Sequence, residues 1–145
     1  VPVPVPVEIT SVYLIEAADL DGSGRPSLFV TNFQSNPNVL FRNLGGLRFQ
    51  DDSFPSGLGG PSVSRLGFGT AALDADGDSL PDLAVANGHV QRAAREVYGV
   101  PFAQDAQLFL CEPGRAGKFR DATATAGDDF VKPRVGRGLA RADFD

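Results

Sequence analysis

The stretch Asp74-Ala75-Asp76-Gly77-Asp78-Ser79-Leu80-Pro81-Asp82 decides the fold, because the same plan stands 55 residues earlier. The earlier copy is Asp19-Leu20-Asp21-Gly22-Ser23-Gly24-Arg25-Pro26-Ser27, and no gap is needed to align the two. A third copy begins 69 residues after the second: Gly136-Arg137-Gly138 repeats Gly67-Phe68-Gly69, and Asp143-Phe144-Asp145 repeats Asp74-Ala75-Asp76. Self-similarity at such a period indicates a repeat architecture.

Each repeat contains four short apolar runs that are separated by Gly, Pro, Asn and Asp. Runs of this kind between turn residues predict strands. The predicted strands are 12–16, 28–31, 39–42 and 49–51 in the first repeat, and 68–72, 83–86, 108–111 and 119–121 in the second. A short helix is predicted within 90–98. Four antiparallel strands per repeat predict an all-β fold built from β-propeller blades, with the aspartate loops lying between strands.

The repeats divide the chain into four parts: an extended Pro/Val arm (1–13), a first blade (14–66), a second blade (67–135) with an excursion at 88–107, and the start of a third blade (136–145). Two blades and a start do not close a ring, so we expect an incomplete propeller in this chain. A sequence that starts at Val1 and contains no methionine is expected to be a processed protein or a piece of a larger one.

Val and Pro alternate strictly over 1–7. Each Pro fixes its own φ and pushes the preceding Val into extended geometry, which predicts a polyproline-like or extended arm. The arm cannot be a central strand, because every second backbone donor is missing. Two interpretations stay open: a linker or docking arm, and a peptide-like segment that engages a partner.

The second loop carries the strongest metal signal. Asp74, Asp76, Asp78 and Asp82 occupy positions 1, 3, 5 and 9, and the backbone carbonyl of Leu80 is expected at position 7. Four carboxylates in nine residues repel one another without a cation, and Ca²⁺ takes six to eight oxygen ligands from loops of this kind. A strand follows instead of an exit helix, which predicts a β-loop-β calcium site and not an EF-hand. The alternative is a solvated Asp-rich turn without metal.

The first and third loops are weaker metal candidates. Asp19 and Asp21 fill positions 1 and 3 of the first loop, but Ser23 stands at position 5, Arg25 at 7 and Ser27 at 9. That loop either binds Ca²⁺ weakly or keeps its turn through hydroxyl hydrogen bonds. The third loop contributes its first two acids, Asp143 and Asp145.

Composition narrows the function classes. The chain has 145 residues, a net charge of −5, and 14 Asp against 4 Glu. An acidic chain without a basic run is a poor candidate for nucleic-acid binding, and no apolar run is long enough to cross a membrane. Cys111 is alone and is expected to be a small buried hydrophobe. His89 is expected to be a structural hydrogen-bonding residue, with ligand or partner contact as the alternative.

Several strings fall in the order of a known family. Phe68-Gly69 followed by the second aspartate loop resembles an FG-GAP repeat, also called a VCBS repeat, which is the blade unit of integrin α-subunit propellers. The closer resemblance is to secreted bacterial proteins that carry these repeats with an ASPIC/UnbV domain, similar to cartilage acidic protein. The strings that carry it are Leu28-Phe29-Val30-Thr31-Asn32, Leu40-Phe41-Arg42-Asn43, Ala86-Asn87-Gly88-His89-Val90, Phe119-Arg120-Asp121-Ala122-Thr123 and Arg134-Val135-Gly136-Arg137-Gly138.

The resemblance covers roughly residues 16–145, and the N-terminal arm departs from it. It implies a propeller of about seven blades, Ca²⁺ in the blade loops and an extracellular or periplasmic location. The family has no established common enzymatic activity, so the resemblance implies a fold and a metal better than it implies a function.

The sequence is compatible with three functions. The leading expectation is a calcium-stabilised, non-catalytic extracellular module that binds a protein or a glycan, or further blades of the same propeller. The second is a structural subunit of a larger assembly or fibre, in which open sheet edges and the arm join neighbours. The third is an enzyme accessory with a site near 88–107, where His89, Glu96 and Asp105 are the residues to examine.

Overall fold

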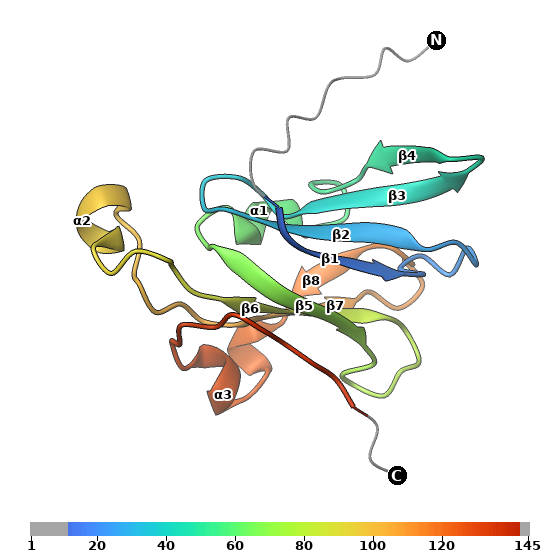
Figure 1. Cartoon of the computed structure of the whole chain (residues 1–145). Coiled ribbons are helices and arrows are strands. Elements are labelled where there is room, and N and C mark those ends of the chain that lie inside the picture. The colour runs from blue at the N-terminus through green and yellow to red at the C-terminus, as the bar shows by residue number, and fades with distance from the viewer. Residues whose placement is uncertain (1–11, 143–145) are drawn as a thin grey trace.

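The structure, a computed structural model, describes residues 12–142 (Figure 1). It is mostly β and contains two four-stranded antiparallel sheets, each with its strands in sequence order. The first sheet is β1 (Val12–Ala18), β2 (Ser27–Asn32), β3 (Val39–Gly45) and β4 (Arg48–Asp51); the second is β5 (Gly67–Leu73), β6 (Asp82–Asn87), β7 (Gln107–Cys111) and β8 (Phe119–Asp121). All eight predicted strands are confirmed, and most extend one or two residues beyond the predicted bounds.

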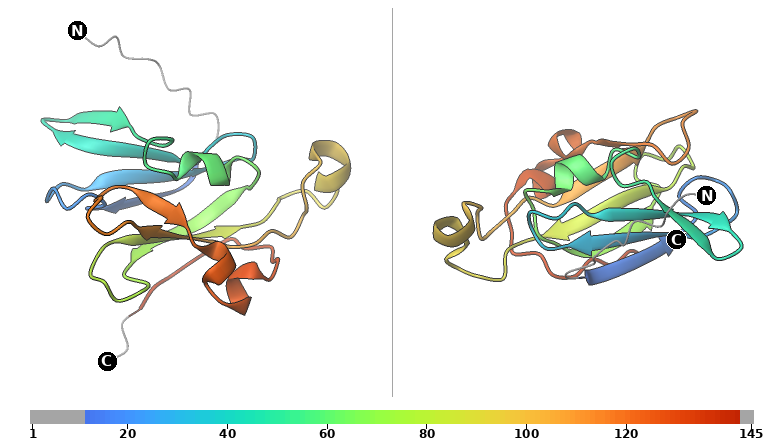
Figure 2. Two further views of the ribbon diagram at one scale, coloured as in Figure 1. Left: turned by 180° about the vertical axis from the view of Figure 1, so that it is seen from behind. Right: turned by 90° about the horizontal axis from the view of Figure 1, so that it is seen from above.

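Short helices occupy some of the connections. They are α1 (Gly59–Ser62), α2 (Ala94–Tyr98), the 3₁₀ helix η1 (Thr123–Thr125) and α3 (Asp128–Val131). The helix predicted within 90–98 is confirmed only in its second half, where α2 ends at Gly99 in the left-handed conformation. The sequence did not predict α1, η1 or α3. Helix α2 projects away from both sheets (Figures 1 and 2).

The arm predicted over 1–13 lies outside the described residues except for Val12 and Tyr13, which belong to β1. Asp143 and Asp145 of the third loop also lie outside them. The described segment that precedes these acids lies beside β5 and the end of β6. The Gly136 N–H donates to the Asn87 carbonyl at 2.9 Å, and the Gly69 N–H donates to the Arg137 carbonyl at 3.1 Å.

The main core lies between the two sheets, since its buried members come from both. Phe29 and Leu40 of the first sheet meet Phe109 and Leu83 of the second, and all four are almost fully buried. Burial of large apolar side chains is the dominant stabilising contribution. The two sheets are therefore held together by one shared core.

A smaller core covers the other face of the second sheet. Ala84, Leu108 and Leu110 are buried there beneath Phe130 of α3 and Leu139 of the C-terminal segment. The segment that begins the third repeat thus already packs on the second sheet.

The same close approach of a glycine to a strand of the preceding repeat occurs at two places in the chain. A Cβ added at Gly67 would meet the Thr31 Cβ at 3.0 Å, and a Cβ added at Gly136 would meet the Ala86 Cβ at 3.1 Å. Thr31 and Ala86 occupy the same repeat position, as do Gly67 and Gly136. The segment that begins each following repeat therefore lies against the second strand of the repeat before it.

Candidate metal centre

The stronger aspartate loop connects β5 to β6. Asp74, Asp76 and Asp78 are exposed there, and each offers a carboxylate oxygen within 4.8 Å of the others. Within residues 12–142 no other group of three His, Cys, Asp or Glu side chains meets this separation. Such carboxylates repel one another, and their oxygens are the ligands that hard divalent cations take. These three residues, named here the carboxylate group, form the candidate metal centre.

The loop positions the carboxylate group through backbone hydrogen bonds. Asp74 accepts the N–H groups of Gly77 at 2.8 Å and Ser79 at 3.0 Å, and Asp78 accepts the Leu80 N–H at 2.9 Å. Gly77 has a φ of +80°, which glycine adopts without strain. A carboxylate has about four lone-pair sites, so these bonds leave acceptor capacity for a cation.

Asp82 ties the loop to the neighbouring strand. It is 1% exposed, and its two oxygens accept the N–H groups of Ala75 and Cys111, each at 2.8 Å. Burial raises the pKa of Asp82, and the negative charges of Asp76 and Asp78 raise it further, whereas the two N–H bonds oppose this. Asp82 is therefore a structural anchor at the base of the loop.

Asp82 and the half-buried Leu80 lie outside the carboxylate group. Leu80 packs its side chain against the core between the sheets. Each Asp82 oxygen keeps a further lone pair beyond its N–H bond. Participation of Asp82 and of the Leu80 carbonyl as metal ligands stays a prediction.

The first loop, between β1 and β2, is built in a similar way with fewer acids. Asp19 accepts the N–H groups of Ser23 at 3.0 Å and Gly24 at 2.8 Å, and Asp21 accepts that of Ser23 at 3.1 Å. Arg25 donates to the Asn43 carbonyl at 3.0 Å, which holds its charge against β3. The Ser23 hydroxyl oxygen is buried without a hydrogen-bond partner among the described residues. This loop could therefore offer a cation two carboxylates and one free hydroxyl.

Charge and burial act in opposite directions on Asp21. Burial alone would raise the pKa of Asp21, but the hydrogen bond from the Ser23 N–H and the positive charge of Arg42 outweigh it. The pKa of Asp21 consequently lies below its ordinary value, so this carboxylate is ionised at neutral pH and available to a cation.

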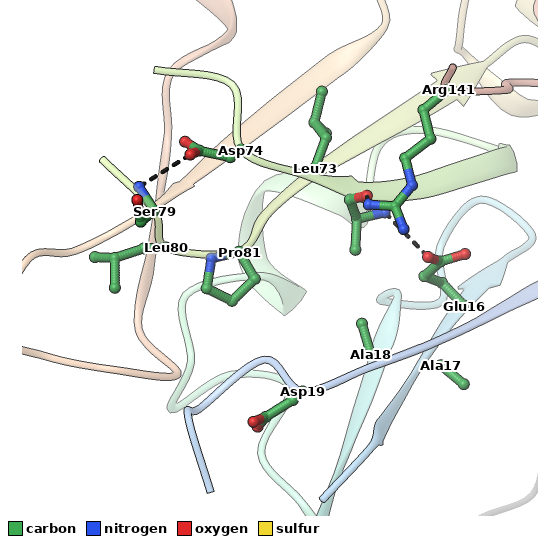
Figure 3. Close-up of a pocket in the computed structure, with 11 residues that line it drawn as sticks. Glu16, Ala17, Ala18, Asp19, Leu73, Asp74, Ser79, Leu80, Pro81 and Arg141 are labelled. Atoms are coloured by element: carbon green, nitrogen blue, oxygen red, sulfur yellow. Dashed lines mark hydrogen bonds between the residues drawn. The ribbon is translucent and has the colours of Figure 1, made fainter. Parts of the chain in front are cut away.

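The two loops flank one open groove of about 470 Å³, shown in Figure 3. Asp19 lines it from the first loop and Asp74 from the second. Across the groove floor, Glu16 accepts the Ala72 N–H at 3.1 Å, while Arg141 donates to the Ala72 carbonyl. A side chain of the first repeat and one from the start of the third therefore both hydrogen-bond to the backbone of Ala72 in β5, beside the two loops.

The residues proposed for an excursion site have separate surroundings. His89 is fully buried, and its Nδ1 accepts the Gln91 N–H at 3.0 Å, which assigns the ring proton to Nε2. Burial lowers the pKa of His89, and the charge of Arg137 lowers it further. Asp105 faces Arg65 at 3.8 Å, whereas Glu96 is exposed on α2. Among residues 12–142, neither Asp105 nor Glu96 forms a hydrogen bond or an ion pair with His89.

An aromatic cluster that the sequence did not predict is formed by five rings, those of Tyr13, Phe33, Phe68, His89 and Tyr98. Adjacent ring centroids are 4.6 to 6.4 Å apart. Its members come from β1, the turn after β2, β5, the root of the excursion and α2. No spacing within the sequence links them, because only the contact between the sheets and the excursion brings them together.

Cys111 is buried in the core between the sheets, as predicted. Burial raises the pKa of its thiol, and the nearby charge of Asp82 raises it further. The group therefore stays a neutral thiol and packs as a small hydrophobe.

No family model matches the chain, and no curated protein matches it. Among residues 12–142, no helix has the length and apolar character to span a membrane. Fold and site together define a mostly β protein with two four-stranded antiparallel sheets and an exposed group of three aspartates that could hold a metal ion.

Proposed function

We propose that this chain belongs to a calcium-stabilised, non-catalytic extracellular interaction module whose partner is a protein or a glycan. In this proposal the two sheets are consecutive blades of a β-propeller, and the carboxylate group of Asp74, Asp76 and Asp78 binds Ca²⁺. The observation that carries the proposal is the convergence of these three side chains in one inter-strand loop.

The assignment of the sheets as blades is supported by the repeated close approach. Gly67 lies against Thr31 in the way that Gly136 lies against Ala86. A contact that recurs from one repeat to the next is what radial repetition of four-stranded sheets requires. The chain would thus supply two blades and the beginning of a third.

The choice of Ca²⁺ over Mg²⁺ is supported by the ligand set. The loop offers many oxygen donors on short Asp side chains within one turn, and Ca²⁺ accepts six to eight such ligands in flexible geometry. Mg²⁺ demands a near-ideal octahedron and keeps several of its waters. An exposed loop with three carboxylates suits the weaker affinities of extracellular calcium modules.

A bound cation would serve the module by stiffening the loop between β5 and β6. Neutralising the mutual repulsion of the carboxylate group stabilises the folded chain, since the unfolded chain lacks the site. The groove between the two aspartate loops would then form a rigid surface for a partner.

The test compares thermal unfolding of the full chain in EDTA, in Ca²⁺ and in Mg²⁺. Ca²⁺ at a hundredfold excess over its dissociation constant should add about 2.7 kcal/mol of stability, and Mg²⁺ should add less. Asp78→Asn should remove most of the Ca²⁺ effect. Identical melting of both proteins in Ca²⁺ and in EDTA would contradict the proposal. A partner from a glycan or secreted-protein array should lose binding in EDTA.

A further inference from the structure

The aromatic cluster has an open side. Tyr98 is 41% exposed, and Tyr13 and Phe33 are half-buried. The ring face of Phe68 is covered by Arg137, whose guanidinium carbon lies 4.4 Å from the ring centroid. The accessible rings are therefore those of Tyr13, Phe33 and Tyr98, which follow one another at 6.4 and 6.0 Å.

Two apolar side chains that neighbour the cluster in sequence are also exposed: Val97 of α2 is 61% exposed and Val90 is 47% exposed. Below the rings, the His89 Nε2 is buried without a hydrogen-bond partner among the described residues. Arg137 is turned inward, because it donates to the carbonyls of Gly88 and His89. A row of three accessible aromatic rings fits an extended, uncharged apolar peptide.

The chain itself carries a peptide of that chemistry. Residues 1–7 alternate Val and Pro and contain no charged side chain. Proline-rich segments adopt the polyproline II conformation in advance, and aromatic-lined surfaces bind them because little further entropy is lost. Proline also lacks the N–H that strand pairing needs.

Position and length favour this segment over a partner in trans. The Val-Pro segment is covalently continuous with β1, because residues 8–11 connect it to Val12, the sequence neighbour of Tyr13. Seven residues in polyproline II span about 22 Å, and residues 8–11 supply the connection. Tethering through so short a connection gives an effective concentration on the order of 1 mM.

We propose that the aromatic cluster is a docking site for residues 1–7 of the same chain, bound as a polyproline II segment across Tyr13, Phe33 and Tyr98. Docking would link the N-terminal arm to both sheets and to the excursion. Docking does not depend on metal binding, so its test is independent of the test of the proposed function.

The chain offers a selective probe of this surface. It contains two tyrosines and no tryptophan, and both tyrosines lie in the aromatic cluster. Tyrosine emission of the full chain therefore reports on the cluster alone. Deleting residues 1–7 should increase acrylamide quenching of this emission. Adding the capped peptide Val-Pro-Val-Pro-Val-Pro-Val should reverse the increase.

Two further variants separate docking from misfolding. Replacing Pro2, Pro4 and Pro6 by Ala preserves the arm length, and it should raise quenching as the deletion does. Phe33→Leu in the deletion variant keeps an apolar side chain, and it should weaken peptide binding by about tenfold. Unchanged far-ultraviolet circular dichroism confirms that each variant is folded.

Quenching that is the same in the full chain, the deletion and the alanine variant would overturn the proposal. Failure of the peptide to bind the deletion variant at millimolar concentration would also overturn it. Quenching of the full chain that falls as its concentration rises would assign the arm to a second copy instead, and this too contradicts docking within one chain.

Discussion

Gly57 packs directly against the backbone carbonyl of Phe119, so that the loop after the first sheet touches the last strand of the second sheet through main-chain atoms. The adjacent Phe119 N–H donates to the Ser56 carbonyl at 2.7 Å. Gly57 has a φ of +93°, a conformation that residues with a Cβ rarely adopt. This backbone contact joins the loop that follows the first sheet to the edge strand β8 of the second sheet.

Gly57→Ala should therefore destabilise the protein by at least about 2 kcal/mol, because the new Cβ meets immovable backbone at an unfavourable φ. Gly60→Ala is the matched control, since a Cβ there meets nothing within 4 Å. The control should be neutral or slightly stabilising. Urea unfolding of both variants measures the difference, and equal stabilities would show that the sheet boundary tolerates a side chain at Gly57.

Asp78 and Asp82 should respond oppositely to substitution when no metal is present. Asp82→Ala leaves the buried N–H of Cys111 without its acceptor, which should cost about 1–3 kcal/mol in EDTA. Asp78→Asn keeps a side-chain oxygen for the Leu80 N–H and removes one charge from the carboxylate group. Its stability in EDTA should equal or exceed that of the unmodified chain. Chemical denaturation in EDTA decides between these roles, and the reverse order would contradict them.

The ion pairs of Asp52 should contribute more to stability than the ion pair between Glu112 and Arg115. Its side chain is almost fully buried, and its carboxylate lies 3.0 Å from Arg42 and 3.8 Å from Lys118. Asp52→Asn should destabilise by about 1–3 kcal/mol, because a buried charge pair is broken. Glu112→Gln, which breaks the more exposed pair with Arg115, should cost less than about 1 kcal/mol. Comparable losses in thermal unfolding would show that burial of Asp52 does not strengthen its pairs.

His89 should make stability depend on pH in mildly acidic solution. Burial lowers the folded-state pKa of His89 below the unfolded value of 6.5. Between these two pKa values the unfolded chain binds more protons, so stability falls as the pH drops below 6.5, until the folded-state pKa is reached. The slope contributed by His89 is at most about 1.4 kcal/mol per pH unit.

The check for His89 is a series of urea unfolding curves between pH 5 and 7.5. His89→Asn should remove its part of the slope while leaving the carboxylate contribution, which dominates at lower pH. Because the chain contains a single histidine, the ring resonances also report its pKa directly. A pKa at or above 6.5 in the folded chain would refute the expected direction.

Local sequence was sufficient to predict every strand. Gly, Pro, Asn and Asp separate the apolar runs, and a strand needs only such a run between turns. The match between the Asp74–Asp82 loop and the earlier loop at 19–27 also predicted that the two four-stranded units are equivalent repeats. The helix within 90–98 was predicted too long, because only Ala94–Tyr98 closes into helical turns before Gly99 ends it.

The candidate site was predictable in part for the same reason. Asp74, Asp76 and Asp78 are close in sequence, so one turn suffices to bring their oxygens together. The anchoring role of Asp82 was not predictable, since its partner Cys111 lies 29 residues away on β7. The aromatic cluster depends still more on distant contacts, because its rings come from five segments.

The sequence by itself determined the strands, the turns between them and the acids that each loop presents, since hydrogen bonding and side-chain spacing within a few residues control these features. The tertiary structure alone decided which surfaces meet: the shared core of the sheets, the contact of Gly57 with Phe119, and the convergence of Tyr13, Phe33 and Tyr98. Such contacts join residues far apart in the chain, and they arise only when apolar surface is buried between complete sheets.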